Sequence, residues 1–130
     1  MVGKEASDAA WLIVQHSVSD PAFMLSSYKL MSESKADIEL SHLAMLYDRI
    51  QFFQGKPQKF GTQMNDDSTI FPVENKAKLN MLRTEFGLPK LSDQVIDKIR
   101  PAEDISKIEN ENPDYVMWRN KVGWNDVAGK

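Results

Sequence analysis

The sequence predicts a mainly α fold, a compact helical domain with about five to six helices and one small β-hairpin. Apolar residues recur at helical spacing over most of the chain, and glycine or proline marks the ends of these stretches. Only one stretch combines β-prone and turn-forming residues. At 130 residues the chain has the length of a single domain. We expect one domain over 1–130, with a helical core at 5–55, the hairpin at 58–74 and C-terminal helices at 75–124.

Three helices are expected in the helical core. The first covers roughly residues 8–17, where an apolar run follows polar capping residues. Asp20 followed by Pro21 is typical of a cap and first turn, and predicts that a second helix begins there. The third helix runs from about 36 to 54, with apolar residues on one face, and ends at Gly55. Together these helices form the expected core.

The remainder of the chain alternates between turn signals and short periodic segments. Residues 59–64 and 69–73 are β-prone and are separated by a polar turn, which predicts the hairpin with a long tip. Helical spacing returns at 77–86 and after Ser92, and proline at position 113 opens a last helix. The polar stretch 109–112 is expected to be exposed.

Composition excludes several classes of function. The chain has 16 basic and 19 acidic residues, a net charge of −3 and no long run of either sign, so a nucleic-acid partner is not expected. The apolar run near the N-terminus is too short to span a bilayer, so we expect no membrane association and a cytoplasmic location. No cysteine and only two histidines are present, which predicts neither a metal site nor a cofactor. The sequence leaves the oligomeric state open.

Gln15 and His16 end the apolar run of the first predicted helix and are the first candidate site residues. A buried amide or imidazole without a hydrogen-bond partner costs roughly 1–3 kcal/mol, so each needs either a structural partner or a ligand. The pKa of histidine suits general acid–base work, which makes His16 the candidate catalytic residue. The alternative is a histidine satisfied within the core. Both interpretations remain open.

Asp48 and Arg49 are the second candidates, because they lie among apolar and aromatic residues of the third predicted helix. A carboxylate and a guanidinium are rarely buried without partners. Asp48 is a candidate catalytic residue that orients an imidazole or pairs with arginine, and Arg49 is a candidate anchor for an anion. An internal salt bridge that fixes the helix against the hairpin explains the pair equally well.

Four residues of the predicted hairpin are candidates for ligand binding: Gln58, Gly61, Thr62 and Gln63. The glycine permits close backbone approach, and the amides and hydroxyl offer neutral donors and acceptors. The segment is not a phosphate loop, because the required second glycine and the Gly-Lys-Ser/Thr ending are absent. An edge strand with a glycine bulge is the structural alternative.

Three separated motifs, AWLIVQH at 10–16, YDRI at 47–50 and FGTQ at 60–63, occur in this order. With Val2-Gly3 and Gln58 they resemble a bacterial family of unknown function whose hallmarks are WLxVQH, DRV or DRI, and QxYGTQ. This chain has Phe60 where the family often has tyrosine. The resemblance covers nearly the whole chain and implies that the candidate residues converge in space. It also implies that relatives carry an N-terminal extension, and it supplies no activity.

Two functions follow as hypotheses. In the first, the domain is an enzyme or binder that acts on a polar or anionic small molecule through the His, Asp, Arg and Gln candidates. In the second, it is a non-enzymatic protein-interaction module, of immunity or adaptor type, in which the same residues form a buried structural network. A solvent-open cleft favours the first hypothesis, and a sealed network favours the second.

Overall fold

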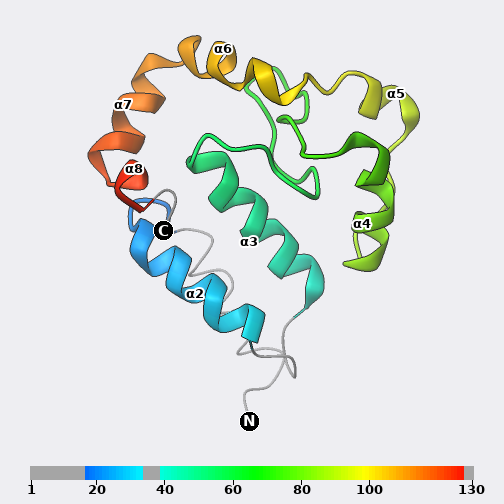
Figure 1. Ribbon diagram of the computed structural model, residues 1–130, viewed down its shortest axis with the longest axis horizontal. Helices are drawn as coiled ribbons and strands as arrows, with labels where there is room; N and C mark the ends of the chain where they lie inside the picture. Colours follow the sequence, from blue (N-terminus) through cyan, green and yellow to red (C-terminus); the bar gives the residue numbers. More distant parts are fainter. Residues whose placement is uncertain (1–16, 34–38, 128–130) are drawn as a thin grey trace.

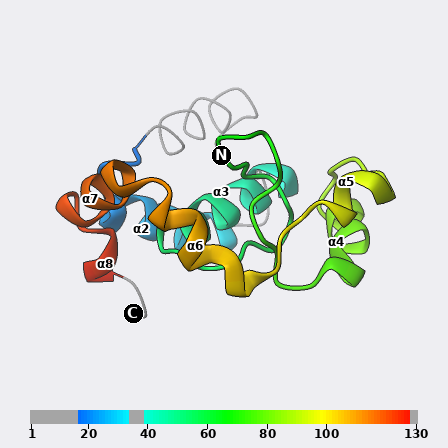
Figure 2. The ribbon, with the colours of Figure 1, turned by 90° about the horizontal axis from the view of Figure 1, so that it is seen from above.

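The computed structural model describes residues 17–33 and 39–127. Helix α3, Leu40–Phe53, lies at the centre, and α2, Pro21–Glu33, packs along it. The rest of the chain forms an arc around α3, so that the last helices return to the beginning of α2 (Figure 1). In the view turned by 90°, α6 passes in front of α3 while α4 and α5 lie together at one end (Figure 2). The described part is mainly helical, as predicted.

The beginning of α2 and the end of α3 lie where the sequence predicts them, whereas α3 begins at Leu40 and not near residue 36. The Asp20 carboxylate accepts the backbone N–H of Phe23 at 3.2 Å, which caps the first turn of α2. Helix α3 ends at Phe53, and Gly55 follows with φ of +71°, a left-handed conformation that favours glycine. The first predicted helix lies outside the described residues. Residues 34–38, where the third helix was predicted to start, also lie outside the described residues.

The predicted hairpin is not formed. Within the described ranges there is no β-sheet, and the segment contains only two isolated bridges, Gln58 with Val73 and Met64 with Ile70. The physical reason is that side chains accept and donate the hydrogen bonds that a strand ladder would use. Three backbone N–H groups of residues 59–62 donate to the carboxylate of Asp48. The side-chain amide of Gln58 donates to backbone carbonyls in both predicted strands.

The C-terminal half is a series of short helices. They are η1 (Lys76–Lys78), α4 (Leu79–Glu85), α5 (Asp93–Asp97), η2 (Ala102–Asp104), α6 (Ile105–Asn110), α7 (Pro113–Lys121) and α8 (Trp124–Val127). Ser92 caps α5 and Pro113 opens α7, as predicted. Helix α6 was not predicted, and it includes part of the polar stretch 109–112 that was expected to be exposed. None of the helices in the described ranges has the length and apolar character needed to cross a membrane.

Trp124 closes the arc onto the central helices. Its ring is fully buried and stacks on Phe53 with ring centroids 5.1 Å apart. Its indole N–H donates to the backbone carbonyl of Val18 at 2.8 Å, so the buried polar group is satisfied. The core at this end also contains Met24 and Leu46. The carboxyl end of α3 is therefore held between both ends of the described chain.

Candidate functional site

Asp48 is fully buried on α3, and its carboxylate organises the turn that follows Gln58. Oδ1 accepts the backbone N–H of Lys59 at 2.8 Å and of Phe60 at 3.0 Å. Oδ2 accepts the backbone N–H of Thr62 at 3.0 Å and its hydroxyl at 2.9 Å. Burial raises the pKa of Asp48, and these donated hydrogen bonds act in the opposite direction. Both carboxylate oxygens are thus saturated by one turn of the chain.

Gln58 is also fully buried, and its amide joins two segments. Nε2 donates to the carbonyl of Phe71 at 2.8 Å and to that of Gln63 at 3.0 Å. Oε1 accepts the backbone N–H of Gln63 at 2.9 Å. The Gln63 side chain in turn donates to the Thr62 hydroxyl at 3.3 Å. We call Asp48, Gln58, Thr62 and Gln63 the Asp48–Gln58 network.

Arg83 of α4 holds the same turn from the opposite side, and the sequence interpretation did not include it among the site residues. It is 7 % exposed, and Nη1 donates to the carbonyls of Phe60 and Gly61 at 2.7 and 3.2 Å. Nε donates to the carbonyl of Pro89 at 2.7 Å. Burial lowers the pKa of Arg83, and the nearby Asp48 carboxylate partly offsets this shift. The signal for Arg83 was its place on the apolar face of α4, four residues after Leu79.

Gly61 completes the turn in a conformation that only glycine adopts freely. Its φ is +69°, and an added Cβ would lie 3.3 Å from Leu79 Cδ1. Its carbonyl receives the Arg83 guanidinium. The structure therefore brings together Asp48 and all four candidates of the predicted hairpin.

The other candidates take different places. Gln15 and His16 lie outside the described residues, so their approach to Gly61 stays a prediction. Arg49 is half-buried on α3, and burial lowers its pKa. Successive helix positions point about 100° apart, so Arg49 faces a different side of α3 from Asp48. The hydrogen bonds described for Asp48 come from the turn and not from Arg49.

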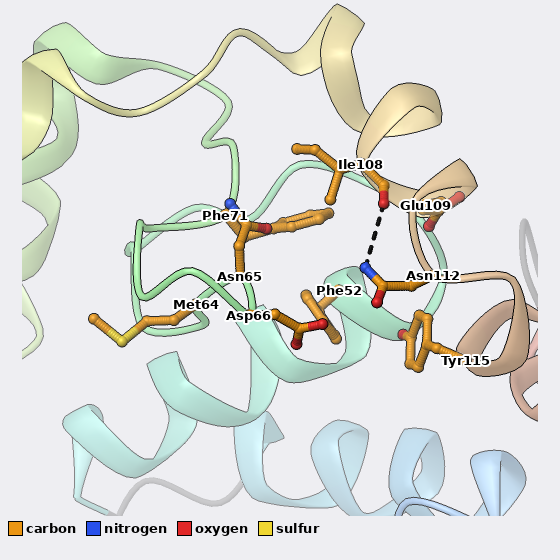
Figure 3. Close-up of a pocket in the computed structure, with 9 residues that line it drawn as sticks. All are labelled: Phe52, Met64, Asn65, Asp66, Phe71, Ile108, Glu109, Asn112 and Tyr115. Carbon is orange, nitrogen blue, oxygen red and sulfur yellow. Dashed lines mark hydrogen bonds between the residues drawn. The ribbon is translucent and has the colours of Figure 1, made fainter.

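A cavity of about 240 Å³ opens beside the network, at the carboxyl end of α3. Its walls come from α3, the segment 64–71 and helices α6 and α7 (Figure 3). We call it the aromatic pocket, and its lining residues are Phe52, Met64, Asn65, Asp66, Phe71, Ile108, Glu109, Asn112 and Tyr115. This lining combines an apolar base with a few polar groups, the usual composition of a small-molecule site.

Two polar atoms of the pocket residues are buried without a hydrogen-bond partner in the described part of the chain. They are Asn65 Oδ1 and the Tyr115 hydroxyl oxygen. Burial raises the pKa of Tyr115, while the charge of the neighbouring Arg119 and its interaction with the Tyr115 side chain act in the opposite direction. A buried polar atom without a partner is uncommon in folded proteins and calls for an explanation.

The Asp48–Gln58 network positions the walls of the aromatic pocket. Gln58 fixes the carbonyl of Phe71, whose ring lines the pocket. The Phe71 N–H donates to the Gln63 carbonyl at 3.0 Å, immediately before Met64 enters the lining. Phe52 lies one helical turn after Asp48 on α3, so both groups share one face of that helix. The motif residues and the pocket thus form one continuous structure.

Sequence reasoning missed the pocket, because its residues come from four separate segments and no motif joins them. One contact that no motif indicates is the ion pair between Arg119 and Glu109, a residue of the pocket lining. Arg119 is 6 % exposed and bonds Glu109 through both terminal nitrogens, which brings α6 and α7 together. Gly55 leaves room for this pair, since a Cβ there would lie 2.9 Å from Glu109 Oε2. Nothing in the sequence of the stretch 109–112 indicated that Glu109 pairs with Arg119.

The described residues contain no cluster of three or more histidine, aspartate or glutamate side chains arranged to hold a metal ion. In comparisons with known proteins, no curated protein and no solved structure matched the chain significantly. One family model matched, over residues 1–108, and its description is a family of unknown function. This confirms the expectation of such a family, and its range includes the whole Asp48–Gln58 network. The chain therefore belongs to the family of unknown function DUF6624.

Proposed function

We propose that the domain binds a small polar molecule in the aromatic pocket. The observation that carries this proposal is the pair of buried, unpartnered polar atoms, Asn65 Oδ1 and the Tyr115 hydroxyl, on residues that line the cavity. Leaving such atoms without hydrogen bonds costs stability, roughly 1–3 kcal/mol each. A ligand that bonds to them recovers part of this free energy on binding.

In this proposal the Asp48–Gln58 network positions the site and does not contact the ligand. Asp48 and Gln58 are fully buried, and the oxygens of Asp48 are occupied by the turn. Gln58 acts through Phe71, whose backbone it holds. Catalysis by His16 stays a prediction from the sequence, separate from the binding proposed here.

A fragment screen by NMR that follows the backbone amide resonances of the protein tests the proposal. We expect small polar aromatic fragments to bind and to shift the amide resonances of residues 64–66 and 112. Asn112→Phe places a ring at the pocket and should abolish these shifts. Asn110→Phe adds the same ring at an exposed position of α6 and should preserve them. Fragments that bind equally to both variants, or a screen without hits, would contradict the proposal.

The second candidate is a non-enzymatic protein-interaction module. The saturated hydrogen bonds of Asp48 and Gln58 favour it, because a closed network is what this alternative requires. Under this alternative the aromatic pocket is a packing defect, and no fragment in the screen reaches residues 64–66. The two candidates therefore predict opposite results for the same experiment.

A further inference from the structure

We infer that the aromatic pocket selects a small organic ammonium ion with a compact apolar body. This inference rests on the proposed function and names the class of ligand. It replaces the anionic ligand that Arg49 suggested in the sequence. Hydrogen-bonding capacity, charge and the aromatic walls each support it.

The free hydrogen-bonding capacity of the pocket is mainly that of acceptors. Asn65 donates its amide N–H to the Thr69 hydroxyl at 3.0 Å, which leaves Oδ1 without a partner. Asn112 likewise directs its Nδ2 to the Ile108 carbonyl at 3.5 Å, so its Oδ1 remains for the pocket. Figure 3 shows the Asp66 carboxylate, the Asn112 amide oxygen and the Tyr115 hydroxyl turned toward the same opening. A ligand rich in N–H donors fits this arrangement.

The charge of the pocket is negative. Asp66 and Glu109 are its two ionisable acids, and none of the nine lining residues is basic. Arg119 neutralises Glu109, but Asp66 has no ion pair among the described residues. Arg100 lines the adjoining hollow together with Asp66, and it pairs with Asp104 at 3.1 Å. The Asp66 carboxylate would therefore repel an anion, whereas a cation would pair with it.

The walls supply a second attraction for a cation. Phe52 lies between two rings, 4.8 Å from Phe71 at 69° and 5.7 Å from Tyr115 at 48°, measured between ring centroids. Aromatic faces attract ammonium groups, and the attraction grows when water is excluded. The cavity of about 240 Å³ is smaller than the ~300 Å³ lower end of typical ligand sites, so the ligand must be compact.

Three probes of similar size test the inference: benzylamine, benzyl alcohol and benzoate. They carry a positive, neutral or negative group on one ring at neutral pH. We expect benzylamine to bind at least about tenfold more tightly than the other two in an NMR titration that follows the amides of residues 64–66, and its affinity to fall as salt is added.

Asp66→Asn should weaken benzylamine about fivefold and leave benzyl alcohol unchanged, because it removes an exposed charge without changing shape. Asp97→Asn makes the same charge change on α5, away from the pocket, and should have no effect. Binding of benzyl alcohol or benzoate as tight as that of benzylamine would overturn the ammonium inference and leave the pocket intact. If none of the three probes shifts residues 64–66, both the inference and the proposed function fail.

Discussion

The Asp48 carboxylate accepts two hydrogen bonds from Thr62, one from its backbone N–H at 3.0 Å and one from its hydroxyl at 2.9 Å. A side chain of the central helix thus takes the place of a neighbouring strand for the turn that follows Gln58. The turn depends on a charged acceptor, because every group that it presents to Asp48 is a donor. Asp48 therefore holds the turn at residues 59–62 against the central helix α3.

Asp48→Asn should destabilise the domain by about 2–4 kcal/mol. The asparagine amide directs an N–H group toward backbone N–H groups that require an acceptor, so at least one buried donor loses its partner. The free energy of unfolding in urea measures this loss. Asp97→Asn is the matched control, and we expect its effect to stay within about 0.5 kcal/mol because the side chain is exposed. Equal stability of the two variants would contradict the role of Asp48.

Gly61→Ala should cost more stability than Gly87→Ala. Both glycines have positive φ, +69° and +75°, so each alanine carries a strain of about 1–2 kcal/mol. Only the Cβ at position 61 meets a neighbour, Leu79 Cδ1 at 3.3 Å, whereas nothing lies within 4 Å of the one at position 87. Urea unfolding of both variants separates backbone strain from crowding. A Gly61→Ala protein as stable as Gly87→Ala would show that Leu79 yields without cost.

The sequence predicted the helices whose ends carry local signals. Asp20 and Pro21 began α2, Gly55 ended α3, and Ser92 capped α5, because each signal acts within one turn of the chain. The hairpin at 58–74 was predicted from the same kind of local evidence and did not form. Several of its backbone groups bond to the side chains of Asp48 and Gln58 instead of to a facing strand, and no local pattern reveals that choice of partner.

The sequence grouped residues that the structure brings together, but their role as a functional site stays a prediction. Gln58, Thr62 and Gln63 were identified together with Asp48, and the structure joins them in one network. Their burial and saturation depend on the packing of distant segments, so the sequence left their role open. The aromatic pocket was beyond reach, because residues as far apart as Phe52 and Tyr115 line it. Spacing along the chain carries no information about that contact.

Stability should fall in alkaline solution through Tyr47. Its hydroxyl donates to Glu74 at 3.2 Å, and burial, followed by the charge of Glu74, raises the pKa of Tyr47 from 10.0 to about 12. Between these values the unfolded chain loses the phenolic proton while the folded protein keeps it. The stabilisation is therefore complete below pH 10 and is lost as the pH rises to about 12. Urea unfolding across this range should show a smaller loss for Tyr47→Phe, and identical profiles would contradict the assignment.

Tyr115→Phe should separate binding from folding at the aromatic pocket. The variant removes one buried hydroxyl without a hydrogen-bond partner and keeps the ring that packs against Phe52 and Phe53. Stability should stay unchanged or rise by up to about 1 kcal/mol, because the desolvation penalty of the hydroxyl disappears and outweighs its interaction with Arg119.

Under the proposed function, probe binding should weaken in the same variant, because Tyr115 lines the pocket and its unpartnered hydroxyl is the group removed. Binding residues are often retained at a cost in stability. A substitution that keeps or raises stability but weakens probe binding is therefore what we expect at a binding site. Thermal melts and the benzylamine titration on the same preparation measure both quantities. Tyr28→Phe is the control, because that ring packs on Tyr47 and lies outside the pocket lining. If Tyr115→Phe melts earlier than wild type and binds the probe normally, the hydroxyl supports the fold and not the ligand.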